Sequence, residues 1–147
     1  MKRVLIGLAV SAALTAAWSV GFAAEKEHQA HKKDVIFASS DKGEFKEVAP
    51  GISKMVLWGD DQKGAYGAFT RFAPGTDNGM HTHTSDCWLT VIKGAYLYKD
   101  DAGEKRVGPG GFIRIPGGKK HWSGGDKTEG ALFYEEASGK FDLIPVK

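Results

Sequence analysis

The chain of 147 residues is 41% hydrophobic and 26% charged, a composition typical of an ordinary folded domain that excludes a disordered, collagenous or membrane-embedded chain. Its formal net charge of only +2 argues against nucleic acid as a partner. The 20 glycines, about twice the usual share, favour short strands joined by tight turns over long helices. At this length we expect one domain.

The first 23 residues have the pattern of a secretory signal peptide. Lys2 and Arg3 precede an apolar run over residues 4–20, and small residues then lead to a cleavage point after Ala23 or Ala24. An uncleaved membrane anchor is the alternative, for which the run is slightly short. Loss of Lys2 and Arg3 lowers the 20 basic side chains to 18, equal to the 18 acidic ones. We therefore predict a periplasmic or secreted protein with no stable membrane association after cleavage and little attraction to polyanions.

Residues 24–33 follow as a polar arm, and the folded domain is assigned to residues 34–147. The arm contains His28 and His31, which could contact one metal ion if the arm were helical. No apolar residue anchors the arm, so we interpret it as a solvated, flexible tail.

Beyond the arm, short apolar or alternating runs separated by turn signals predict β-strands. These runs are residues 35–38, 45–48, 55–58, 65–72, 87–92, 95–98, 111–115 and 131–136. No stretch shows the capped 3.6-residue period of a helix. Regularly spaced strands without intervening helices predict an all-β fold, either an antiparallel sandwich or a barrel.

Three histidines form the candidate metal site. His81 and His83 lie two apart, so both rings point to one face of an extended strand, and His121 follows much later in the chain. Cys87 has the same parity as the first two. Three imidazoles can hold a divalent metal and leave coordination positions open, and a thiolate could add a soft fourth ligand. Cys87 is the only cysteine, so it forms no internal disulfide, and a buried inert thiol is the alternative.

The context of these histidines resembles the cupin superfamily. Its first motif is Gly, five residues, His-x-His, three or four residues, Glu, six residues and Gly; the matching positions are Gly75, His81, His83, Cys87 and Gly94. Its second motif begins Gly, five residues, Pro-x-Gly, two residues and His; the matching positions are Gly110, Pro116, Gly118 and His121. The resemblance covers residues 65–134. It implies an RmlC-like double-stranded β-helix, or jelly-roll barrel, with the histidines pointing into its mouth.

Two positions depart from the family pattern. Cys87 stands where cupins have a metal-binding Glu, and Gly125 stands where the second motif ends in Asn. The first departure removes the usual carboxylate ligand and base. Within the superfamily, residues 56–60 and 64–69 make the chain similar to the cupin domain of zinc-binding anti-sigma factors.

A second resemblance is to thiol dioxygenases, cupins with a three-histidine iron site. In some of them a cysteine replaces the motif Glu and is crosslinked to a tyrosine. Cys87 stands at that position, and Tyr134 is the candidate partner and catalytic residue that this resemblance implies. A core aromatic is the alternative interpretation of Tyr134.

Together these patterns predict an exported protein that binds a divalent transition metal through His81, His83 and His121, with Cys87 as the candidate fourth ligand. A closed site suits zinc, and an open one suits iron, manganese, nickel or copper. We expect a role in binding or sensing an unknown small molecule. The alternatives are an oxygenase or isomerase acting on a small thiol or acid, and a structural cupin without metal. The sequence also allows a homodimer formed through an exposed sheet edge.

Two arginines are candidates for ligand recognition. The planar guanidinium groups of Arg71 and Arg114 could each bind a carboxylate through two parallel hydrogen bonds. Each could equally end a strand in water. The sequence leaves both interpretations open.

Overall fold

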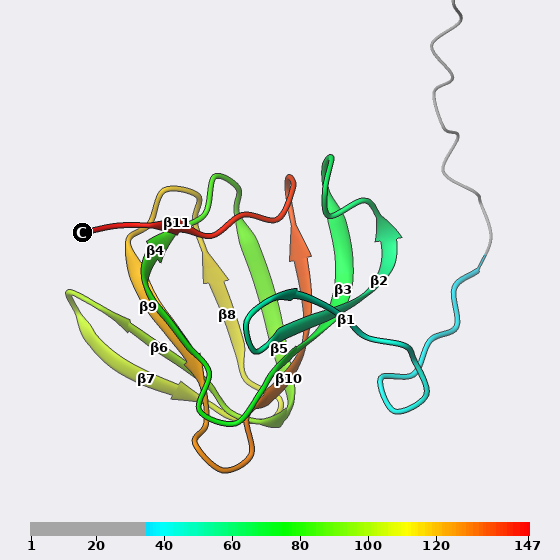
Figure 1. Ribbon diagram of the computed structural model, residues 1–147, viewed down its shortest axis with the longest axis horizontal. Helices are drawn as coiled ribbons and strands as arrows, with labels where there is room; N and C mark the ends of the chain where they lie inside the picture. Colours follow the sequence, from blue (N-terminus) through cyan, green and yellow to red (C-terminus); the bar gives the residue numbers. More distant parts are fainter. Residues whose placement is uncertain (1–34) are drawn as a thin grey trace, which may run out of the picture. The chain divides into compact units, whose positions relative to one another are not determined.

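The computed structural model describes residues 35–147 as eleven β-strands without a helix (Figure 1). This confirms the prediction of an all-β fold. The predicted signal peptide (1–23) and arm (24–33) lie outside the described residues and stay predictions. No helix long and apolar enough to cross a bilayer occurs between residues 35 and 147.

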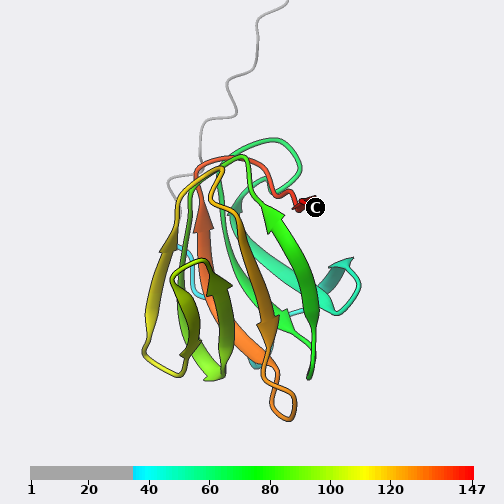
Figure 2. The same ribbon diagram turned by 90° about the vertical axis from the view of Figure 1, so that its left-hand side faces the viewer.

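The strands form two antiparallel sheets that face each other (Figures 1 and 2). In the order β1-β2-β3-β10-β5-β8, sheet A consists of β1 (Lys46–Ala49), β2 (Ile52–Gly59), β3 (Tyr66–Phe72), β10 (Ala131–Ala137), β5 (Cys87–Gly94) and β8 (Phe112–Ile115). In the order β11-β4-β9-β6-β7, sheet B consists of β11 (Ile144–Pro145), β4 (Asp77–Thr82), β9 (His121–Gly125), β6 (Tyr96–Asp100) and β7 (Gly103–Val107). The chain crosses repeatedly between the sheets, as in a jelly roll.

The hydrophobic core lies between the inner faces of the two sheets. Phe133 of β10 makes edge-to-face contacts with Phe72 of β3 at 5.0 Å and with Tyr96 of β6 at 5.3 Å between ring centroids. Such aromatic pairs add to the stabilisation that burial of the rings provides. Because inward and outward residues alternate along each strand, every second side chain enters the barrel.

One predicted strand is absent. Residues 35–38 form no strand, and Val35 and Phe37 are 77% and 91% exposed. Their apolar character therefore does not reflect burial within the described part of the chain. The other seven predicted runs overlap observed strands.

Candidate metal centre

The three histidines come together at one end of sheet B. His81 lies in β4, and His121 is the first residue of β9, its antiparallel neighbour, where the two residues are paired directly. His83 comes directly after the last residue of β4. The ring centroid of His81 lies 4.3 Å from that of His121 and 4.9 Å from that of His83. One ring nitrogen from each histidine lies within 4.8 Å of the other two. Strand pairing thus joins the two parts of the predicted ligand set.

Backbone carbonyl groups set the tautomer of all three rings. Each Nδ1 lies 2.6–2.9 Å from a carbonyl oxygen, and the partners of His81, His83 and His121 are the carbonyls of Gly79, Asp142 and Lys119. A carbonyl oxygen only accepts hydrogen bonds, so each Nδ1 carries the proton and each Nε2 keeps its lone pair. This arrangement is typical of metal-binding histidines.

The Nε2 atom of His121 is buried and has no hydrogen-bond partner among the described residues. Leaving a buried polar atom without a partner is costly, and a coordinated metal ion would satisfy it. The donor set therefore fits a divalent transition metal.

Burial also keeps the imidazoles neutral. His81 and His121 are 1% and 0% exposed. Desolvation is the main reason why the pKa of His81 falls to about 4, and the neighbouring imidazoles lower it further. Desolvation likewise lowers the pKa of His83 and His121. The Tyr98 ring stacks on His121 at 5.4 Å and helps to hold it in place. At neutral pH all three lone pairs are available to a metal.

Residues 138–146, which we call the C-terminal strap, cross one end of the barrel from β10 to the edge of sheet B, where β11 pairs with β4 (Figure 1). The carboxylate of Asp142 accepts hydrogen bonds from the Thr84 backbone N–H at 3.0 Å and from the Thr84 hydroxyl at 2.5 Å. The same residue supplies the carbonyl that orients His83. The Phe141 backbone N–H donates to the Asp61 carbonyl at 2.7 Å. The strap thereby encloses the candidate metal centre.

Cys87 enters the same space from the opposite sheet. It is the first residue of β5 and lines, with His81 and His83, a narrow cavity of about 30 Å³. Its sulfur lies 3.8 Å from the Ser85 carbonyl and is not part of the group of ligand atoms within 4.8 Å. Burial raises the pKa of the thiol to about 11. The structure therefore brings Cys87 near the histidines without placing it as a fourth ligand.

The parity argument for Cys87 also needs correction. Residues 83–86 leave the strand conformation between β4 and β5, so the alternation along β4 does not continue to Cys87. Cys87 faces the histidines because it projects from sheet A towards sheet B.

Tyr134 lies on the outer face of sheet A. Its neighbours on β10, Phe133 and Glu135, both line the inner cavity, so Tyr134 points the other way. Its hydroxyl accepts a hydrogen bond from Trp58 at 3.2 Å and donates one to Glu136 at 2.7 Å. This position corrects the expectation of a catalytic or crosslinked Tyr134, because sheet A separates it from the histidines.

A buried ionic group was missed by sequence reasoning. Lys54 of β2 is 3% exposed, and its ammonium donates hydrogen bonds to the Glu135 carboxylate and, at 2.6 Å, to the Tyr66 hydroxyl. The Tyr66 hydroxyl donates to Glu135 at 2.7 Å, and the Phe141 ring lies 4.1 Å from the ammonium. Desolvation lowers the pKa of Lys54 to about 7. The only signal of this group in the local sequence is one charged residue at an inward position of each strand, Lys54 in β2 and Glu135 in β10.

Comparisons with solved structures support the fold. KdgF from Halomonas sp. is 19% identical with a TM-score of 0.60, and the match covers 74% of this chain and 97% of that one. The polyketide cyclase RemF from Streptomyces resistomycificus is 15% identical with a TM-score of 0.62, covering 78% and 87%. An RmlC-like cupin from Shewanella frigidimarina NCIMB 400 is 18% identical with a TM-score of 0.56, covering 69% and 89%. These identities show a shared fold alone.

Among curated proteins no relative matches the chain. The family model of the ChrR cupin-like domain matches residues 16–139, which include both histidine motifs and most of the barrel. The jelly-roll topology and the clustered histidines agree with this match. The chain therefore belongs to the ChrR cupin-like family of small cupin domains.

Proposed function

We propose that this protein is an exported cupin that binds a divalent transition metal through His81, His83 and His121 and thereby binds or senses a small molecule. The observation that carries the proposal is the convergence of three ring nitrogens within 4.8 Å, each from a ring oriented by a carbonyl. The Nε2 of buried His121, which has no hydrogen-bond partner within residues 35–147, also supports it.

Three neutral imidazoles without a carboxylate leave coordination positions for a ligand. Zinc, iron, manganese, nickel and copper all accept such a donor set. A bound metal would supply a Lewis acid, while the carbonyl partners of the histidines would hold the donors in place. The cavity of about 30 Å³ beside the histidines has room for a water-sized molecule, so a larger ligand requires its lining, which includes Phe141 and Leu143 of the C-terminal strap, to move.

Binding or sensing is favoured over oxygenase chemistry by the residues around the histidines. The family's carboxylate is replaced by Cys87, whose raised pKa keeps the thiol protonated at neutral pH. Tyr134, the partner needed for a crosslink, lies beyond sheet A. Neither residue is placed to move a proton at a metal-bound ligand.

The decisive experiment is elemental analysis of the mature protein, purified from the exported fraction without added metal or chelator. We expect close to one equivalent of a transition metal. The variant His83→Ala should lose most of it while retaining the circular dichroism of the folded barrel, because one of three donors is removed. Unchanged metal content in a folded His83→Ala protein would refute the ligand assignment.

Cys87→Ser is the matched variant for the fourth ligand. Because its sulfur lies outside the group of close ligand atoms, we expect this variant to keep its metal. Loss of metal from Cys87→Ser would restore Cys87 as a ligand and indicate a closed N₃S site of the kind that suits zinc.

The remaining parts of the proposal have their own measurements. Cell fractionation with mass analysis of the N-terminus tests export and cleavage after Ala23 or Ala24. Light scattering tests the homodimer prediction, which a mass equal to one mature chain would exclude.

A further inference from the structure

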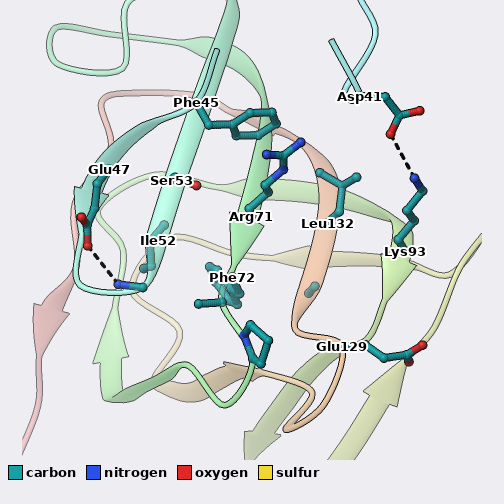
Figure 3. A pocket seen from close by; sticks show the side chains of 14 residues that line it. Asp41, Phe45, Glu47, Ile52, Ser53, Arg71, Phe72, Lys93, Glu129 and Leu132 are labelled. Carbon is teal, nitrogen blue, oxygen red and sulfur yellow. Dashed lines mark hydrogen bonds and ion pairs between the residues drawn. The ribbon is translucent and has the colours of Figure 1, made fainter. Parts of the chain in front are cut away.

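A second pocket lies on the outer face of sheet A, over β2, β3 and β10 (Figure 3). Its volume of about 620 Å³ is in the usual range for small-molecule sites. Leu132 and Pro74 form apolar walls, and Phe45 from the segment before β1 closes one side. Arg71 projects into this pocket from β3. Thr70 and Phe72, its neighbours, line the inner cavity, so the guanidinium points away from the histidines.

The Arg71 side chain is held in place but keeps most of its hydrogen-bonding capacity. Its guanidinium carbon lies 3.6 Å from the centre of the Phe45 ring, and one nitrogen donates to the Ser40 carbonyl at 2.7 Å. Within residues 35–147, no carboxylate oxygen lies within 4.0 Å of this guanidinium; the pocket's Lys93, by contrast, pairs with Asp41 at 3.0 Å. A guanidinium offers five N–H donors, so several stay available to a ligand.

The carboxylates around the pocket are directed to other partners. Asp41 pairs with Lys93, Glu47 accepts a hydrogen bond from the Gly51 backbone N–H at 3.3 Å, and Glu129 lies 3.9 Å from Arg106. Within residues 35–147, Arg71 is therefore the cation of this pocket that has no ion-pair partner. The three acidic groups at the rim repel any anion, and this repulsion doubles for a charge of −2. The pocket is therefore suited to a ligand with a single negative charge.

We propose that this pocket binds a small monocarboxylate with an apolar body. The carboxylate would accept two parallel hydrogen bonds from Arg71, and the apolar part would lie against Leu132 and Pro74. The stack on Phe45 and the bond to Ser40 orient the guanidinium before the ligand arrives, which lowers the entropic cost of binding. This site is separate from the candidate metal centre and does not depend on it.

Benzoate is a suitable probe, and a nitrogen-15 NMR titration of the full mature chain is the measurement. We expect saturable shifts at the backbone amides of Arg71, Leu132 and Phe45. Benzyl alcohol lacks the charge, acetate lacks the apolar body, and phthalate carries a second charge, so each should bind more weakly than benzoate.

Arg71→Met should weaken benzoate binding about tenfold or more, the usual loss when a hydrogen-bonded charged partner is removed. Arg71→Lys keeps the charge but not the planar donor pair and should also bind more weakly. The matched control is Arg114→Met on β8 of the same sheet, because Arg114 already pairs with Asp86 at 2.7 Å. That variant should bind benzoate like the wild type.

His83→Ala separates this proposal from the metal proposal, because it should lose metal and keep benzoate binding at Arg71. Shifts confined to residues near the histidines would overturn the proposal, as would absence of saturable shifts or equal affinity in the wild type and Arg71→Met. If Arg71→Met does not fold, the location of the wild-type shifts and the affinity of Arg71→Lys decide.

Discussion

Acidification should destabilise the metal-free protein through His81. The pKa of this residue is about 4 in the folded state, against an ordinary value of 6.5 that applies to the unfolded chain. Below about pH 6.5 the unfolded state therefore binds a proton that the folded state excludes, and the free energy of unfolding falls as the pH falls towards 4. At pH 5 the unfolded histidine is protonated and the folded one is still mostly neutral. Over these roughly 1.5 pH units, the loss is about 2 kcal/mol at about 1.36 kcal/mol per unit.

Urea unfolding of chelator-treated protein at pH 8 and pH 5, followed by tryptophan fluorescence, measures this loss. The comparison variant is His81→Asn, whose amide can donate to the Gly79 carbonyl as Nδ1 does but does not titrate. The wild type should lose about 2 kcal/mol more than His81→Asn between the two pH values. Lys54 and the other buried histidines remain in both proteins, so their titration largely cancels. Equal pH dependence in the two proteins would refute the argument that His81 is buried in the neutral form.

Two further predictions concern the interior of the barrel. At pH 6, below the pKa of about 7, Lys54 is charged. Lys54→Met then leaves the Glu135 carboxylate without its cation and should lower the free energy of unfolding by about 3–5 kcal/mol. Adding Glu135→Gln should recover part of that loss, and a cost below about 1 kcal/mol in the single variant would contradict the buried pair. Phe133→Ala removes a core ring that is 1% exposed and should cost about 3–5 kcal/mol, while Phe112→Ala at a site that is 64% exposed should change stability by less than about 0.5 kcal/mol. Chemical denaturation measures both pairs, and similar losses for the two phenylalanines would be inconsistent with the packing.

Much of the architecture could be predicted because both histidine motifs have a fixed spacing between turns and strands. Strands such as β3 and β10 were predicted from their runs of alternating or apolar residues. β7 was missed because it is an edge strand with four exposed residues and one half-buried one, so no apolar alternation marks it. β9 was missed because it contains small residues. A Cβ at Gly124 would lie 2.5 Å from the Thr76 carbonyl oxygen, so close backbone packing requires glycine there.

Contacts between distant segments limited the prediction of the site. The face on which Tyr134 lies follows from the inward position of Phe133, which the sequence of β10 alone does not specify. Lys54 and Glu135 are 81 residues apart, and only the pairing of β2 and β10 with β3 brings them together. The carbonyl of Asp142 that orients His83 belongs to no motif. Sequence spacing can identify candidate metal ligands, but their supporting partners come from the tertiary structure.

Through the C-terminal strap, binding of a metal and binding of a guest in the mouth of the barrel would affect each other. Asp142 holds the strap to Thr84 and also orients His83, so lifting the strap removes the partner of one metal ligand. A guest that displaces the strap without contacting the metal should therefore weaken metal affinity, and bound metal should oppose entry of that guest by the same factor. Exchange of the ion would also proceed through the open form, so its rate would level off at high chelator concentration, at the frequency of strap opening.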